Sequence, residues 1–274
     1  MIDFKRIISE TTRYNFHSHT QYCDGRSTLE AIANSAADVG LLYLGFTPHS
    51  PIPVESPCNM AATDVPAYKN ELLRVAQLLQ GRCQLYCGME IDYLGSQWGP
   101  ATQYFADLGL DYSIGSVHFI PAQGGEYVDI DGHFDNFSRR MDKHFHRDIR
   151  YVVETYYEQS QRMLAEGGFE ILGHFDKIGQ NASMYHPGIE QEGWYADLVD
   201  GYIDQILKSD VVVEINTKAY SEHHRFFPHT RYWKMLKDAG VPLMVNSDVH
   251  YADRVEASRF EAFEILNSIN DGAR

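Results

Sequence analysis

The sequence alternates between short apolar runs and longer amphipathic stretches. The apolar runs are four to eight residues long, which predicts β-strands at residues 14–17, 42–47, 84–91, 112–118, 169–174, 211–216 and 243–248. The amphipathic stretches predict helices at residues 28–40, 65–80, 101–108, 147–167, 193–209, 229–240 and 253–269. Strands that alternate with helices in this way predict βα units and a parallel sheet, and therefore an α/β protein.

Capping residues support the predicted helix boundaries. Ser27 begins a Ser-Thr-Leu-Glu stretch that places Glu30 three residues later, so Ser27 is predicted to cap the helix that follows. Gly40, Gly81 and Gly240 stand where helices are expected to end, and each comes shortly before a predicted strand. These glycines therefore mark the change from helix to strand.

The number of units and the chain length bound the architecture. Seven strand–helix units favour a closed (β/α)7 barrel over an open doubly wound sheet, the alternative that the pattern leaves open. Without a Gly/Ser-rich or Pro-rich linker, residues 1–274 are expected to form one domain. Segment 121–146 is too long and polar for an ordinary connection, and we predict that it is an insertion that shapes the active site.

Each predicted strand ends on polar side chains of the kinds that bind metals. These side chains are His17 with His19, His49, Glu90, His118, His174, Glu214 with Asn216, and Asp248 with His250. The carboxyl ends of parallel strands meet at one face of a barrel, so we expect these residues to gather there. Residues spaced by two project to the same side of a strand, which lets each His-x-His or Asp-x-His pair hold one ion. Mixed nitrogen and oxygen ligands suit zinc, iron or manganese better than calcium or magnesium.

Taken singly, these residues have structural explanations. A lone histidine at a strand end is commonly held by hydrogen bonds, and Glu90 in an apolar run is able to pair with an arginine inside the barrel. Their recurrence at the ends of successive strands is what favours a metal centre. The remaining histidines lie in polar loops or on helix faces and are not expected to bind metal: His133, His144, His146, His186, His223, His224 and His229.

The order of these residues resembles a known family. His17-x-His19, Asp24, His49, Glu90, His118, His174 and Asp248-x-His250 follow the pattern of the polymerase and histidinol phosphatase (PHP) family, and within it the stand-alone histidinol phosphatases. The phrases GSVHFI, LGHFDKI, VEINTKA and NSDVH carry the same resemblance. It extends over nearly the whole chain.

The resemblance implies a distorted seven-stranded TIM-like barrel that holds up to three divalent metal ions, which are zinc, manganese or iron. The implied ligands are His17, His19, Glu90 and Asp248 for the first ion, Glu90, His118 and His174 for the second, and Asp24, His49 and His250 for the third. Related branches carry a histidine near the position of Asp24. Because aspartate is a competent oxygen ligand, the third site is expected to bind metal with a different affinity or preference.

The resemblance also implies hydrolysis of a small phosphate monoester. The most specific expectation is hydrolysis of L-histidinol phosphate to L-histidinol and phosphate in histidine biosynthesis, with nucleophilic hydroxide supplied near neutral pH by metal-bound water. Asp248 or His250 is the candidate catalytic acid, whereas Glu214 and Asn216 are expected to hydrogen-bond the site from outside the ligand set. The alternatives are another ester, such as phosphotyrosine, a nucleotide or a sugar phosphate, and a non-catalytic metal-binding module.

Charged residues outside the ligand set are candidates to hold the substrate. The candidate phosphate-binding residues are cations near strand ends, namely Lys177, Lys218 and Arg225. The candidates to attract a substrate ammonium or imidazole are acids of the 121–146 segment, namely Asp129, Asp131 and Asp135.

The net charge and the cysteine content limit the classes of partner and the cellular location that we expect. The chain carries 38 acidic and 23 basic residues, and its formal charge of −15 argues against DNA, RNA or an anionic membrane as a partner. A phosphate-bearing substrate then needs local positive charge, which bound metal ions would supply. The four cysteines form no CxxC pair and are expected to be reduced thiols. With no signal-peptide pattern and no apolar run of about 20 residues, the protein is expected to be cytoplasmic.

Overall fold

Seven parallel strands form the centre of the molecule. The computed structural model describes residues 2–271. The strands are β1 (Tyr14–Asn15), β2 (Tyr43–Phe46), β3 (Gln84–Asp92), β4 (Tyr112–Ser116), β7 (Ile171–Leu172), β8 (Val212–Asn216) and β9 (Leu243–Asn246), and they neighbour one another in that order. Just beyond β1 and β9, Ser18 and Val249 form a parallel bridge, and the His19 amide donates to the Val249 carbonyl at 2.8 Å. The sheet thereby closes into a nearly complete barrel. This confirms the predicted α/β barrel and excludes the alternative of an open doubly wound sheet.

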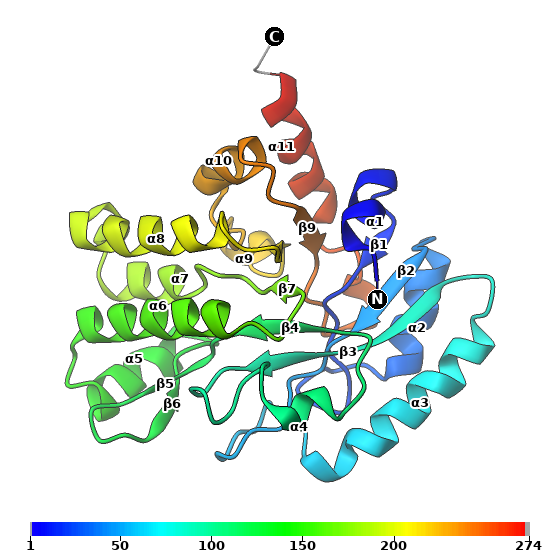
Figure 1. Ribbon diagram of the computed structural model, residues 1–274, viewed down its shortest axis with the longest axis horizontal. Coiled ribbons are helices and arrows are strands. Elements are labelled where there is room, and N and C mark those ends of the chain that lie inside the picture. The colour runs from blue at the N-terminus through cyan, green and yellow to red at the C-terminus, as the bar shows by residue number, and fades with distance from the viewer. Residues whose placement is uncertain (1, 272–274) are drawn as a thin grey trace.

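Helices surround this barrel (Figure 1). They are α1 (Phe4–Glu10), α2 (Leu29–Asp38), α3 (Val65–Leu78), α4 (Gln103–Ala106), α5 (Phe134–His144), α6 (Ile149–Glu166), α7 (Ile178–Tyr185), α8 (Gly193–Ile206), α9 (Tyr220–His223), α10 (Trp233–Asp238) and α11 (Arg259–Asp271). In Figure 1, α5 to α8 cover one side of the barrel, and α2 and α3 cover the other. Across residues 2–271, no helix has both the length and the apolar character needed to cross a bilayer.

The predicted caps are partly correct. Gly40, Gly81 and Gly240 all adopt positive φ angles at the ends of their helices, as predicted. The predicted cap at Ser27 is wrong, because the Thr28 side chain accepts the Ala31 amide and begins α2. The Ser27 hydroxyl instead accepts the Ala252 amide at 2.9 Å, which ties the start of α2 to the chain after β9.

Aromatic side chains fill the barrel at the end where the strands begin. The Phe4 ring of α1 lies 4.9 Å from that of Phe16 and 5.5 Å from that of Tyr112, so α1 packs against the barrel interior. The Tyr112 hydroxyl donates to the Phe16 carbonyl at 2.7 Å. A β-carbon at Gly45 or Gly88 would overlap the Tyr112 side chain, so glycine at both positions makes room for it.

Segment 121–146 has a regular structure of its own. It contributes most of the β5 (Phe119–Pro121) and β6 (Tyr127–Asp129) hairpin and all of α5. Val128, Phe137 and Met141 are buried in the same apolar cluster as α6 and α8. Its role in shaping the active site stays a prediction.

Candidate metal centre

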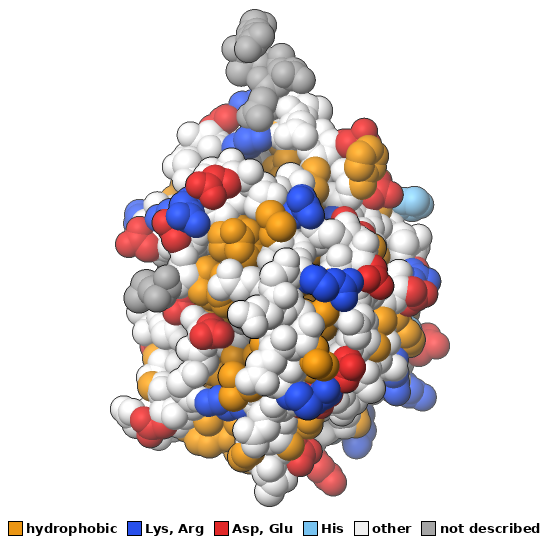
Figure 2. Space-filling view, turned by 90° about the vertical axis from the view of Figure 1, so that its right-hand side faces the viewer, with side chains coloured by type: hydrophobic (Ala, Val, Ile, Leu, Met, Phe, Trp, Pro, Cys, Tyr) orange, Lys and Arg blue, Asp and Glu red, His pale blue; other side chains and the backbone are white. Residues whose placement is uncertain are grey.

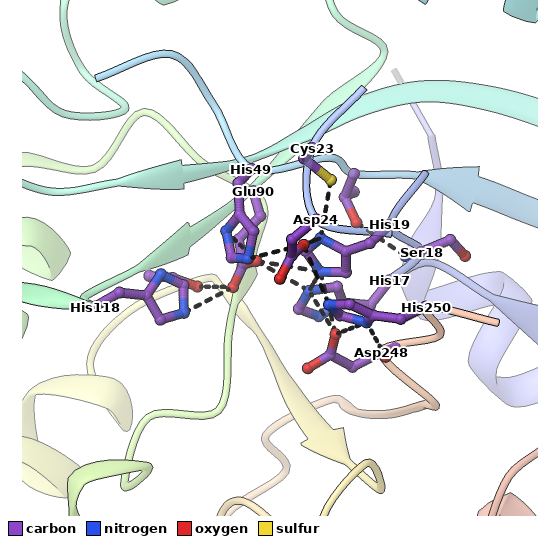
Figure 3. Close-up of polar contacts among 12 residues, drawn as sticks. His17, Ser18, His19, Cys23, Asp24, His49, Glu90, His118, Asp248 and His250 are labelled. Atoms are coloured by element: carbon purple, nitrogen blue, oxygen red, sulfur yellow. Dashed lines mark hydrogen bonds and ion pairs between the residues drawn. The ribbon is translucent and has the colours of Figure 1, made fainter. Parts of the chain in front are cut away.

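The polar residues that follow the strands gather at one end of the barrel (Figure 3). They form four overlapping groups whose nitrogen and oxygen atoms lie within 4.8 Å of one another. The groups are His17, His19 and Asp248; Glu90, His118 and His174; His19, Asp24, His49 and His250; and His49, Asp92 and His118. The nine predicted ligands are therefore brought together, although they lie up to 233 positions apart along the chain, from residue 17 to residue 250.

The first group surrounds the two histidines that follow β1. Their Nε2 atoms face each other at 3.1 Å, and the His19 Nε2 also lies 3.1 Å from the Asp248 Oδ1. Glu90 reaches the same group through its Oε2, 3.3 Å from the His17 Nε2. Asp248 has a φ of 50°, a left-handed conformation that is uncommon outside glycine and that often marks a functional site.

Glu90 joins the first group to the second. Its Oε1 lies 2.8 Å from the His174 Nε2 and 3.4 Å from the His118 Nε2, so each carboxylate oxygen faces a different group. Burial alone would raise the pKa of Glu90, but His17, His118 and the neighbouring His49 hold it well below its usual range. Glu90 is therefore ionised and suited to bridge two cations.

The third group lies nearer to solvent. The Asp24 Oδ1 is 3.3 Å from the His250 Nε2 and 3.8 Å from the His49 Nε2, and the Asp24 side chain is 24% exposed. The His19 Nδ1 also lies 3.7 Å from the Asp24 Oδ1, so this group includes a histidine that the sequence assigned only to the first ion.

The donor set fits divalent metal ions. The Asp24 Oδ1 and the His49 Nδ1 are buried and form no hydrogen bond of good geometry within residues 2–271, although the His250 Nε2 lies 3.3 Å from the first and the Glu90 Oε2 3.1 Å from the second. This state is costly for polar atoms unless a further partner binds them. Histidine nitrogens and carboxylate oxygens converge in every group, and this mixture suits zinc, iron and manganese. A cation in each of the first three groups would pair with lone pairs that otherwise face one another.

Two buried carboxylates hold histidines from behind. The His17 Nδ1 donates to the Glu214 Oε1 at 2.6 Å, and the His118 Nδ1 donates to the Asp92 Oδ1 at 2.7 Å. Each contact leaves the Nε2 lone pair of that ring directed at the centre, as is usual for metal-bound histidines. The expected position of Glu214 outside the ligand set agrees with this contact, whereas the sequence interpretation missed Asp92. Its spacing of two from Glu90 on β3 was the available signal.

The three candidate phosphate-binding residues occupy different positions. The Lys218 Nζ lies 3.1 Å from the His250 Nε2 and 3.4 Å from the Asp248 Oδ1, at the centre itself. Lys177, three residues after His174, is 15% exposed, and its Nζ pairs with the Asp131 Oδ2 at 3.0 Å. Arg225 donates to two acids outside the ligand set, and none of its hydrogen bonds or ion pairs within residues 2–271 reaches a predicted ligand.

The other histidines lie elsewhere. His144 pairs with Glu126 at 2.6 Å and His186 with Glu192 at 2.9 Å, while the His229 Nδ1 accepts an amide. Within the part of the chain that the structure describes, the four groups of facing ligand atoms contain none of the histidines that the sequence set aside.

The fold and site together define an α/β barrel with a multinuclear metal centre at the carboxyl ends of its strands. Residues 15–218 match the PHP domain family, so the chain belongs to the PHP family. The matched segment contains seven of the nine predicted ligands, and Asp248 and His250 lie beyond it.

Individual relatives agree with this membership. A probable histidinol-phosphatase from Deinococcus radiodurans is 27% identical over 251 residues, which cover 87% of this chain and 86% of the relative. Among solved structures, a putative histidinol phosphatase from Listeria monocytogenes matches with a TM-score of 0.79 and 16% identity, over 90% of this chain and 99% of the other. A histidinol phosphate phosphatase from Lactococcus lactis, crystallised with zinc, L-histidinol and phosphate, matches with a TM-score of 0.67 and 16% identity, over 93% of each chain. At these identities the two structures support the fold alone.

Proposed function

We propose that this protein is a metal-dependent phosphatase that hydrolyses L-histidinol phosphate to L-histidinol and phosphate. The observation that carries the proposal is the set of overlapping imidazole and carboxylate groups that share Glu90. The family membership and the name of the Deinococcus relative support the same reaction. The Lactococcus phosphatase, which has a similar fold and binds zinc, L-histidinol and phosphate, supports the choice of cofactor and substrate.

The proposed ligands divide among three ions. His17, His19, Glu90 and Asp248 would hold the first ion, Glu90, His118 and His174 the second, and Asp24, His49 and His250 the third. When bound, divalent metals supply Lewis acidity and positive charge for the hydrolysis of a phosphate ester. They also offset the three ligand carboxylates, so that an acidic protein is able to hold an anionic substrate.

The protein's own residues then bind the phosphate and move protons. We assign the phosphate oxygens to Lys218, whose Nζ contacts His250 and Asp248, and to Lys177, which precedes α7 and lies three residues after His174. Burial alone would raise the pKa of Asp248, but Lys218 and His17 hold it well below its usual range. The ionised carboxylate is free to take the proton of the attacking water; its low pKa makes it a weak base but, once protonated, a strong acid toward the leaving alkoxide. His250, whose Nδ1 donates to the Asp248 carbonyl at 3.0 Å, supports this residue.

Phosphate release after metal exchange tests the proposal. Protein stripped with a chelator should release little phosphate from L-histidinol phosphate, and loading with manganese, zinc or iron should restore turnover. A metal-loaded protein that releases no phosphate from this ester would overturn the assignment. A parallel panel of phosphotyrosine, nucleotides and sugar phosphates distinguishes the proposed substrate from other esters, and a protein that binds metal but hydrolyses none of them is a non-catalytic module.

Glu90→Gln tests the site itself. The exchange removes a negative ligand shared by two groups, so we expect lower metal content and a loss of most turnover, about 100-fold or more. Glu154→Gln is the matched control, because Glu154 is a partly exposed residue of α6 that pairs with Arg150 at 2.7 Å, away from the centre. Unchanged metal content and rate in Glu90→Gln would contradict the site assignment.

The distribution of charge on the surface indicates which classes of partner are disfavoured. Figure 2 shows basic side chains interspersed with acidic ones over the face formed by α2 and α3, without a continuous basic patch among the coloured side chains. This pattern and the formal charge of −15 support a small-molecule substrate over a nucleic acid or an anionic membrane. The cytoplasmic location stays a prediction from the sequence.

A further inference from the structure

An acidic residue of the insertion reaches the margin of the metal centre. Asp131 follows β6, and its Oδ2 lies 3.0 Å from the Lys177 Nζ. Its backbone amide donates to the Asp129 Oδ1 at 2.8 Å, and the Asp129 Oδ2 pairs with Arg140 of α5 at 2.7 Å. Asp129 of the hairpin, Arg140 of α5 and Lys177 therefore fix the position of Asp131.

Asp131 differs from the other carboxylates around the centre. Asp92 and Glu214 are 1% and 0% exposed and lie behind the histidines, whereas the side chain of Asp131 is 27% exposed. Burial alone would raise the pKa of Asp131, but Lys177, His118 and His174 hold it well below its usual range, so it is ionised. An ionised carboxylate with an accessible oxygen thus lies beside the cations that are proposed to hold a phosphate.

Taken alone, the negative charge of Asp131 is unfavourable for the binding of a phosphate group. The backbone amide of the preceding residue, Ile130, donates to the carbonyl of the ligand His118 at 2.9 Å, so Asp131 lies beside the centre and its charge would repel the phosphate dianion. The same charge favours a substrate that carries a positive group a few bonds from its phosphate. An amine on the carbon next to the ester carbon has this short separation.

We propose that the Asp131 carboxylate binds the ammonium group of the substrate and makes the enzyme selective for phosphate monoesters of 2-amino alcohols. This inference rests on the proposed phosphatase function. The Oδ2 keeps its contact with Lys177, and the Oδ1 receives the ammonium.

Two matched esters test the proposal. O-Phosphoethanolamine and propyl phosphate have the same number of heavy atoms, but only the first carries an ammonium group. The wild-type enzyme should have the higher kcat/KM for the amine ester. In Asp131→Asn, kcat/KM for the amine ester and for L-histidinol phosphate should fall about tenfold to a hundredfold, while that for propyl phosphate changes less than about threefold.

Asp142→Asn is the matched control, because Asp142 is an exposed residue of α5 that pairs with Arg147 at 2.6 Å. This variant should keep the ester preference of the wild type. An equal loss for both esters in Asp131→Asn, together with weaker inhibition by inorganic phosphate, would show that Asp131 only positions Lys177 and would overturn the proposal.

If Asp131→Asn does not fold, the ester preference of the wild-type enzyme still tests the proposal. Hydrolysis of both esters without preference for the amine contradicts the role of Asp131 and leaves the phosphatase function standing. If the metal-loaded wild type hydrolyses neither these esters nor L-histidinol phosphate, the proposed function fails and this inference fails with it.

Discussion

Two carboxylates behind the ligand histidines set the direction of the rings. Asp92 accepts from the His118 Nδ1 and is itself held by the Asn59 amide, which donates to its Oδ2 at 2.8 Å. Glu214 accepts from the His17 Nδ1 and, through its Oε2, from the His174 backbone amide at 3.0 Å. Both side chains are fully buried, so their charges are compensated mainly by contacts of this kind.

Asp92→Asn tests this positioning role. The variant loses the negative charge behind His118, so the affinity of the Glu90–His118–His174 group for metal should fall about 10-fold to 100-fold. The His17 group, which Glu214 supports, should keep its affinity. Metal titration with quantification of bound ions per chain measures both effects.

A control variant and a contrary result are defined for Asp92→Asn. Asp107→Asn removes an exposed acid that accepts from Gln103 at 2.7 Å, and it should leave metal binding unchanged. Equal weakening of all metal sites in Asp92→Asn would indicate a general structural role for Asp92 and contradict the selective one.

The sequence predicted the candidate ligands better than their surroundings. Eight of the nine ligand positions follow from strand parity and from the ends of apolar runs, which are local features, whereas Asp24 was indicated only by the family resemblance. Asp92 has the same parity as Glu90, but nothing local indicates that it faces His118, 26 positions away. The two acids that hold Arg225 are equally remote, because Asp176 lies 49 positions away and Glu190 lies 35. Contacts of this kind depend on how the barrel closes.

At the scale of elements, Arg225 connects three segments near the centre. Its Nη2 donates to Asp176, which follows β7, at 3.0 Å and to Glu190, in the turn after α7, at 2.9 Å. Arg231 also pairs with the Glu190 Oε1 at 2.9 Å. The candidate phosphate-binding role of Arg225 stays a prediction, and these contacts assign it at least a structural one.

Glu190→Gln should lower stability in a pH-dependent manner. Burial alone would raise the pKa of Glu190, but Arg225 and Arg231 hold it below its usual range. A carboxyl with a depressed pKa in the folded state stabilises it above the unfolded-state pKa of about 4.3, and this contribution is lost as the pH falls through the folded-state pKa. At pH 7 the free energy of unfolding should therefore fall by about 2 kcal/mol in the variant.

Urea unfolding from pH 7 down to pH 3 measures this difference. The gap between the wild type and Glu190→Gln should begin to narrow at about pH 4.3, the unfolded-state pKa, and continue to narrow as the pH falls toward the lower folded-state pKa. Glu158→Gln, which removes an exposed partner of Arg162 on α6, should shift stability by less than about 0.5 kcal/mol at any pH. A gap for Glu190→Gln that is constant over the whole range would contradict the charge-based explanation.

The predicted elements are correct where the apolar period is strong. All seven predicted strands and helices such as α3, α6 and α8 are present. Helices α1, α5, α7 and α9 were not predicted, because they are short or mostly polar and derive their stability from packing. Helix α5 shows the reason most clearly, because Phe137 and Met141 are the buried side chains of its mostly polar sequence.

At the scale of the whole molecule, the two ends of the barrel have different tasks. The end where the strands finish carries the metal-binding groups, and the end where they begin is filled by aromatic side chains and covered by α1. Arg259 of α11 is 1% exposed and donates to the Thr12 and Tyr14 carbonyls, so the last helix is fastened to the first strand. Closure of the barrel thus depends on contacts between the two ends of the chain.

Phe4→Ala tests whether stability and activity are separable in this way. Phe4 is 5% exposed, and its ring packs against Phe16 and Tyr112 at the end opposite the metal centre. Truncation should lower the free energy of unfolding by about 3–4 kcal/mol and the Tm by about 5–10 °C. Phosphatase kcat/KM and metal content, measured well below the Tm, should stay within about twofold of the wild type.

Phe260→Ala provides the matched control for that variant. It makes the same chemical change on α11 at a side chain that is 69% exposed, so the Tm should move by less than about 2 °C. If Phe4→Ala leaves the Tm unchanged, α1 does not contribute to the barrel core. If it removes activity or metal while the chain remains folded, the packing beneath the barrel also determines the geometry of the centre, and the two ends are coupled.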